Sequence, residues 1–143
     1  MHDSVSKRNI AFATKFVQEA NLGAGIGITL VEKDMLGKDT VTFGRNDICG
    51  TDWRMYFYFP GNSTFEIWYT RQVTAQQKPQ LLELVADVRE LTSIHGWRYQ
   101  EINASYSHYG LRVVAIIPRR KFSGAARLFG DMDADITKCL EAT

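Results

Sequence analysis

Residues 53–70 read WRMYFYFPGNSTFEIWYT, and this stretch decides the fold. Two aromatic runs with alternating side chains flank a Pro-Gly-Asn turn, which is the pattern of an antiparallel β-hairpin. The alternation places each set of side chains on its own face of the hairpin. The set expected in the core is Trp53, Met55, Phe57, Phe59, Phe65, Ile67 and Tyr69. The other face is expected to carry Arg54, Tyr56, Tyr58, Glu66, Trp68 and Thr70.

A helix and two strands are expected before this hairpin. Ala13, Phe16, Val17 and Ala20 recur at helical spacing and predict a helix. Ser4 or Ser6 is expected to cap that helix, and Gly23 to end it. Alternating apolar residues then predict strands near 26–31 and 40–43.

Two helices and two further strands are expected after the hairpin. Pro79 suits the first turn of a helix, and Gly96 suits its end. Strands are predicted at 97–102 and 111–117, and the second is apolar on both faces, which indicates an interior strand. Ser123 is predicted to cap a last helix that Gly130 kinks or splits.

The element order α-β-β-β-β-α-β-β-α predicts an α+β fold with a mostly antiparallel sheet of five or six strands and three helices. This order resembles that of type III secretion chaperones, which have a helix, a group of strands, a second helix, two strands and a last helix. The chain has one expected strand more, and it is neutral where those chaperones are acidic. The resemblance implies a similar architecture alone. The length of 143 residues predicts one domain over residues 1–143.

The charge balance excludes a strongly acidic or strongly basic protein. Lys and Arg number 17 against 16 Asp and Glu, so the formal charge is +1. Cys49 and Cys139 lie far apart and belong to no disulfide framework, which predicts reduced thiols and a cytoplasmic location. No apolar run reaches the roughly 18 residues of a membrane span, so no membrane is expected as a partner.

No motif predicts catalysis, a cofactor or a metal. Cys49 with His95 or His108 is the minimum pair for thiol chemistry, but the residues around Cys49 match no setting that activates a nucleophile. Asp131, Asp133 and Asp135 begin like a calcium loop that then lacks its glycine and its final glutamate. We interpret these three carboxylates as a solvated face of the last helix. The prediction is a protein that is not an enzyme, although an enzyme with an unrecognised site stays an alternative.

The second face of the hairpin predicts a binding surface, because Tyr, Trp and Arg are the residue types that anchor protein interfaces. The expected partner-binding residues are Arg54, Tyr56, Tyr58 and Trp68, with Tyr106 and Tyr109 from a later loop. The function predicted is a non-enzymatic protein-binding module: an inhibitor, immunity protein, chaperone-like adaptor or other accessory protein. A homodimer is a further expectation. The alternative is that one of the protein's own helices covers this face.

A basic cluster supports a different binding function. Arg112, Arg119, Arg120 and Lys121 gather before the last helix, where cations beside a helix N-terminus could hold a phosphate. Aromatic residues near such cations also form stacking platforms for single-stranded nucleic acid. Nucleic-acid or phosphate-ligand binding is therefore the alternative, while short basic runs at strand ends are also common as solvated groups.

Overall fold

The computed structural model describes residues 5–23, 25–46, 52–105 and 108–141. Within them the chain forms three α-helices and a six-stranded antiparallel sheet in the order that the sequence predicts, so the α+β class is confirmed. The elements are α1 (Lys7–Ala20), β1 (Ile26–Lys33), β2 (Asp39–Asn46), β3 (Asp52–Phe59), β4 (Thr64–Thr74), α2 (Lys78–His95), β5 (Arg98–Ser105), β6 (His108–Pro118) and α3 (Phe122–Glu141).

The strand order in the sheet is β1-β2-β3-β4-β6-β5, and every neighbouring pair is antiparallel. The predicted hairpin is β3 and β4, with Tyr56 opposite Trp68. The strand predicted to be interior is β6, which lies between β4 and β5. The sheet edges are therefore β1 and β5.

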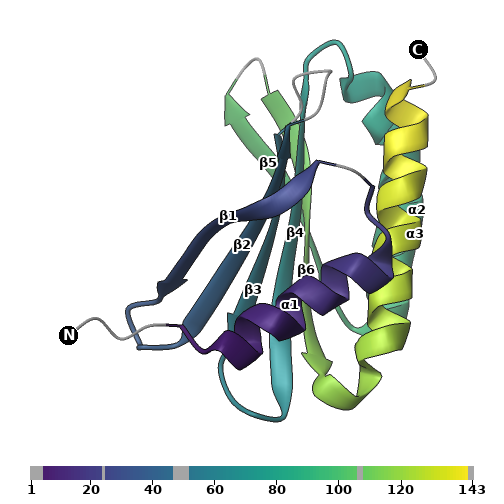
Figure 1. Cartoon of the computed structure of the whole chain (residues 1–143). Coiled ribbons are helices and arrows are strands. Elements are labelled where there is room, and N and C mark those ends of the chain that lie inside the picture. The colour runs from purple at the N-terminus through teal and green to yellow at the C-terminus, as the bar shows by residue number, and fades with distance from the viewer. Residues whose placement is uncertain (1–4, 24, 47–51, 106–107, 142–143) are drawn as a thin grey trace.

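The helices and one face of the sheet enclose the core. Figure 1 shows α1 crossing the sheet, with α2 and α3 running beside each other. Phe16 of α1 makes edge-on ring contacts with Phe57, Phe65, Phe122 and Phe129, at centroid distances of 5.3 to 6.1 Å. Such contacts join α1 to the sheet and to α3. The hairpin residues predicted for the core are all buried there, as expected: Trp53, Met55, Phe57, Phe59, Phe65, Ile67 and Tyr69.

The helix ends follow the sequence in part. Pro79 lies in the first turn of α2, and Gly96 follows its end with a positive φ of 69°. The predicted cap of α3 is wrong: a 3₁₀ turn over Arg119–Lys121 leads into the helix, so Ser123 lies inside it. The Ser123 hydroxyl instead hydrogen-bonds the Glu19 carboxylate at 3.2 Å. The helix is unbroken at Gly130.

Asp39 connects the start of α1 to the β1–β2 hairpin. Its carboxylate accepts hydrogen bonds from the Ser6 backbone N–H (3.0 Å), Asn9 Nδ2 (2.8 Å) and Lys33 Nζ (2.7 Å). The residue is only 6% exposed. Burial raises the pKa of Asp39, but the hydrogen bonds from Lys33, Asn9 and Ser6 together outweigh burial and hold this pKa below its ordinary value.

We expect the stabilisation that Asp39 provides to be lost at acid pH. Because its pKa is lower in the folded state, its contribution is fully present above the unfolded pKa of about 3.9 and is lost as pH falls through the folded pKa. The Asp39→Asn variant should lose about 1–3 kcal/mol of unfolding free energy at pH 7. Urea unfolding between pH 3 and pH 7 would measure the difference in unfolding free energy between the variant and wild type. This gap should narrow below about pH 4. A gap that stays constant over this range would contradict the expectation.

Candidate protein-binding face

The sheet face that points away from the helices, called here the open face, carries the predicted aromatic surface. Residues of the hairpin alternate between the buried core and this face, and the three helices pack on the core side. None of the helices that the structure describes covers Tyr56, Tyr58 or Trp68, so the alternative of a covering helix is wrong. By strand register, the open face includes Arg54, Tyr56, Tyr58, Glu66, Trp68, Arg98, Arg112, Val114 and Ile116.

Three aromatic rings and one guanidinium form a contiguous cluster at the centre of the open face. Tyr56 and Tyr58 are stacked at 6.4 Å, and Tyr58 meets Trp68 edge-on at 5.6 Å. The Arg112 guanidinium lies over the Trp68 ring at 5.1 Å, and its Nε donates to Thr70 Oγ1 at 3.1 Å. We call Tyr56, Tyr58, Trp68 and Arg112 the aromatic cluster. Its side chains hold one another in place, which lowers the entropy lost when a partner binds.

The Tyr58 hydroxyl of the aromatic cluster stays protonated near neutral pH. Burial, helped by the nearby Tyr56 and Glu66, raises the pKa of Tyr58 above its ordinary value. The hydroxyl of Tyr58 therefore stays a hydrogen-bond donor. A surface with apolar rings and polar tips suits a protein interface.

The structure separates Tyr109 from the other predicted contact residues. Tyr109 pairs with Val73 on the helix side of the sheet and is 3% exposed, with Lys78 Nζ 5.0 Å from its ring centroid. The sequence interpretation placed it at an exposed loop tip, but β6 already begins at His108. Tyr109 is therefore core and not a contact residue. Tyr106 lies outside the described residues.

The four cations of the predicted basic cluster do not form one site. Arg112 belongs to the open face. Arg119 lies over the rings of Phe12 and Phe59, at 5.0 and 5.3 Å. Arg120 and Lys121 are exposed in the 3₁₀ turn. The sheet itself divides these cations, because Arg112 points to the face opposite α1 and α3.

The sequence interpretation missed a buried ionic network around Asp133. Its carboxylate accepts hydrogen bonds from Trp53 Nε1 (2.8 Å), the Tyr69 hydroxyl and Arg71 Nη1 (3.2 Å). Arg45 Nη1 lies 3.7 Å from the same carboxylate. The interpretation of Asp133 as solvated is therefore wrong. The sequence did contain a sign of this network. Arg71 continues the alternation of Tyr69 and Val73, which places its charge at a core position. A charge buried there requires a buried partner of opposite charge.

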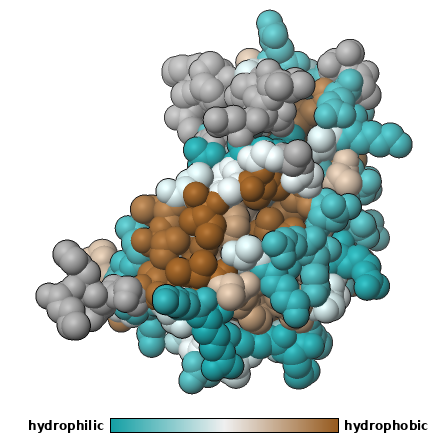
Figure 2. All heavy atoms as spheres, viewed as in Figure 1, coloured by the Kyte–Doolittle hydropathy of each residue, from teal (hydrophilic) through white to brown (hydrophobic). Residues whose placement is uncertain are grey.

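Apolar side chains are exposed along the β1 edge. Ile28 is 43% and Leu30 is 49% exposed, and Met35 and Leu36 in the following turn are almost fully exposed. Figure 2 shows an apolar patch on the β1 and β2 side of the molecule. An unpaired apolar edge strand is a surface on which chains associate. The homodimer stays a prediction.

The predicted thiol pair and metal binding were also compared with the residues that the structure describes. Cys49 lies outside them, as does the side chain of His108, so the thiol pair stays untested. No group of three or more His, Cys, Asp or Glu side chains in the described ranges could hold a metal ion. Within those ranges no helix is both long and apolar enough to cross a membrane.

Comparison of the chain with protein-family models, curated proteins and solved structures found no match.

Proposed function

We propose that the chain is a non-enzymatic protein-binding module of the cytoplasm, acting as an inhibitor, immunity protein, chaperone-like adaptor or other accessory protein. The observation that carries the proposal is the aromatic cluster on the sheet face opposite the three helices. The solvated face of an antiparallel sheet is usually polar. Tyr, Trp and Arg concentrated there are the types enriched at the energetic centres of interfaces.

Charge on the open face indicates the chemistry of the partner. Arg54, Thr70, Arg112 and Gln100 form one row across the sheet. Two guanidinium groups therefore lie along one side of the three aromatic rings, that of Arg112 within the aromatic cluster and that of Arg54 beside it. Glu66 borders it on the other side, opposite Tyr58. A complementary partner presents an apolar patch with carboxylates along one border.

The double variant Tyr56→Ala, Trp68→Ala is expected to bind its partner at least about 100-fold more weakly, because hot-spot truncations cost about 2 kcal/mol or more each. Affinity capture from nuclease-treated extract of the native host would identify the partner. Calorimetric titration with the purified partner would then measure the affinity, after circular dichroism has shown that the variant folds.

The matched control removes two apolar side chains from the opposite side of the molecule. Leu82→Ala, Ile94→Ala changes two exposed residues of α2, and this variant should bind as wild type does. A partner that binds both folded double variants as tightly as wild type would contradict the proposed use of the open face.

Nucleic-acid binding is the second candidate, because Arg54, Arg98 and Arg112 share the open face with Tyr56 and Trp68. Bases can stack on such rings while the cations contact phosphate. This candidate requires an affinity for single-stranded oligonucleotide that falls steeply with salt, because phosphate contacts release counterions. Unchanged fluorescence anisotropy of a labelled oligonucleotide at about 50 mM salt would exclude it.

A further inference from the structure

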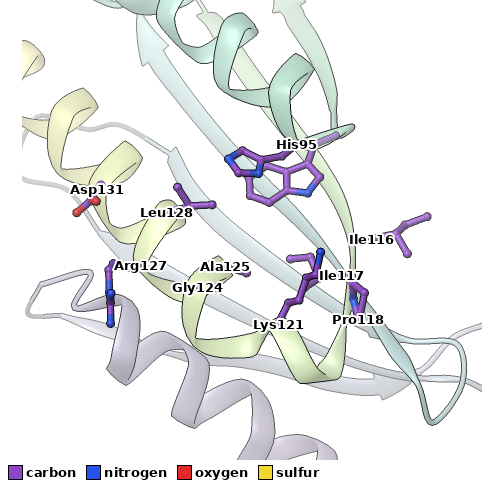
Figure 3. A pocket seen from close by; sticks show the side chains of 11 residues that line it. His95, Ile116, Ile117, Pro118, Lys121, Gly124, Ala125, Arg127, Leu128 and Asp131 are labelled. Atoms are coloured by element: carbon purple, nitrogen blue, oxygen red, sulfur yellow. The ribbon is translucent and has the colours of Figure 1, made fainter.

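Exposed apolar side chains gather on β1 and on the turn that follows it. Of the eight large apolar residues that are exposed in the described ranges, five lie there: Ile28, Leu30, Val31, Met35 and Leu36. A groove of about 570 Å³, where β6 extends past β5 and meets α3, exposes less apolar surface. Ile117 and Ala125 in its lining are buried, and Ile116 points away from the groove (Figure 3). The exposed apolar surface is therefore centred on β1.

The main chain of β1 is accessible along its outer edge. β1 is the first strand of the sheet, and β2 is its only partner strand in the described part of the chain. Every residue from Gly27 to Glu32 is exposed, although the side chains alternate between the two faces. Gly27 has no side chain, so its exposed surface is main chain. A Cβ at Gly27 or Gly25 would meet no described atom within 4 Å, so a second strand has room at this edge.

The register identifies the residues whose main chain points outward from β1. The Asp34 N–H donates to the Lys38 carbonyl at 2.8 Å, and hydrogen-bonded positions alternate along an antiparallel ladder. β2 pairs with β3 without irregularity, so every second residue of β2 from Asp39 to Arg45 bonds toward β3. Their partners in β1 then direct their N–H and C=O groups away from β2. These partners are Lys33, Val31, Ile28 and Ile26.

These four outward positions are symmetric about the middle of the strand. Their midpoint lies between Thr29 and Leu30, and Thr29 has no partner in β2. A two-fold axis at this midpoint places Ile28 opposite Val31 of a second copy, and the first of the four positions opposite the last. No other two-fold register pairs all four, because outward groups must meet outward groups. The irregularity at Thr29 then lies beside the axis in both strands, so β1 is complementary to itself.

The side chains on both faces agree with this register. Ile28 and Val31 both pair with core residues of β2, so these two apolar side chains meet on the helix side. On the open face, Glu32 would lie opposite Gly27 of the second copy. The row of Gly27 continues through a second glycine to Arg54, over a hollow of about 250 Å³.

The Arg54 guanidinium extends along this row toward the edge. Its Nη1 lies 3.1 Å from the position that a Cβ at Gly44 would take, one strand nearer to β1. The carboxylate of Glu32 from a second copy would enter the hollow over Gly27 and approach this guanidinium. Opposite charges brought together in this way favour one partner and one register.

We propose that the chain forms a two-fold dimer in which β1 pairs antiparallel with β1 of a second copy, about an axis between Thr29 and Leu30. Two-fold dimers are the commonest protein assemblies, and pairing removes an apolar edge from solvent. The turn that carries Met35 and Leu36 lies beside the segment that precedes β1 in the other copy. The two sheets become one, and both open faces lie on the same side of it because the axis is perpendicular to the sheet. This assembly is independent of what the open face binds.

Light scattering of the purified protein should report twice the 16.3 kDa mass of one chain. Leu30→Asp puts two carboxylates close to the axis on one face and removes apolar burial from both copies, so it should weaken the dimer at least about tenfold. Leu82→Asp is the matched control, because Leu82 is 46% exposed and Leu30 is 49% exposed. Leu82 lies on α2, and its variant should stay dimeric. Sedimentation velocity would measure the dissociation constants.

Disulfide trapping tests the register and does not depend on the folding of Leu30→Asp. Ile28→Cys and Val31→Cys are prepared as separate proteins, each with Cys49→Ser and Cys139→Ser. A mixture of the two should form a cross-linked dimer, because the two positions are opposite each other. Neither protein should cross-link alone, since identical positions are then offset by three residues along the strand, farther than a disulfide spans.

The open-face variant Tyr56→Ala, Trp68→Ala should remain a dimer, so failure of this proposal and failure of the proposed function are distinguishable. A monomer at every concentration would overturn the proposal, as would a monomer that takes up a strand of a different protein at β1. Cross-linking of either cysteine variant alone, no cross-linking of the mixture, or an unchanged dissociation constant in Leu30→Asp would overturn it as well.

Discussion

Replacing Asp133 by alanine is expected to lower the free energy of unfolding by about 3–5 kcal/mol, because it removes one partner of a buried ion pair. The Arg71 side chain is fully buried and would keep its charge without this carboxylate. The indole N–H of Trp53 and the hydroxyl of Tyr69 would lose their acceptor as well. Buried donors without acceptors add to the loss.

Asp135→Ala is the matched control for Asp133→Ala. Both make the same substitution in α3, so the change in helix propensity is equal, but Asp135 is exposed. The control should change stability by no more than about 0.5 kcal/mol. Urea unfolding at pH 7 would measure both variants. Losses for the two that agree within 1 kcal/mol would show that the Asp133 network does not stabilise the fold.

Because Tyr69 stays protonated, the hydrogen bond from its hydroxyl to Asp133 is kept. Burial and the adjacent Asp133 carboxylate raise the pKa of Tyr69 well above its ordinary value. The hydroxyl therefore stays a donor to Asp133 throughout the neutral range. The network joins α3 to β3 and β4, which carry the three rings of the aromatic cluster on their other face.

Gly130→Ala is expected to destabilise the protein by about 1–3 kcal/mol, the usual cost of overpacking. A Cβ at this position would collide with the backbone carbonyl oxygen of Ala20, so α1 and α3 would have to move apart. A backbone atom at a helix crossing cannot move alone. The collision therefore outweighs the roughly 1 kcal/mol that alanine gains over glycine in helix propensity.

Gly124→Ala in the same helix separates the effect of the collision from the effect of helix propensity. A Cβ there would meet no atom within 4 Å, so only the helix propensity changes and stability should rise by up to about 1 kcal/mol. Thermal and urea unfolding of the two variants would measure the difference. Equal changes in both variants would contradict a close approach of α1 at Gly130.

The period-two pattern of residues 53–70 was enough to predict β3, β4 and the buried side of each. Side chains alternate strictly along a strand, so the hydrophobic face follows from local sequence once the strand is recognised. Pro79 and Gly96 marked the bounds of α2 for a similar reason, because their backbone preferences are local. The prediction that Ser123 caps α3 was wrong, because a 3₁₀ turn leads into this helix in place of a side-chain cap.

Tyr109 and Asp133 were misplaced because their positions depend on distant residues. Tyr109 lies on the helix side only because β6 begins at His108 and pairs with β4 in one register. Asp133 is buried because Trp53, Tyr69 and Arg71, more than 60 residues earlier, supply its donors. Charged residues read from local sequence are expected on the surface, since burial is tolerated only with partners that the local sequence does not show.

The sequence by itself determined the element order, the α+β class and the separation of the hairpin into an apolar face and an aromatic, Arg-bearing face. These features rest on local periodicity and turn residues. Only the tertiary structure decided that all three helices pack on the apolar face, that Arg112 joins Trp68 while Arg119 does not, and that β6 extends past β5 to form a groove. The reason is physical: contacts between segments far apart in the chain depend on strand order and register, which local side-chain patterns do not encode.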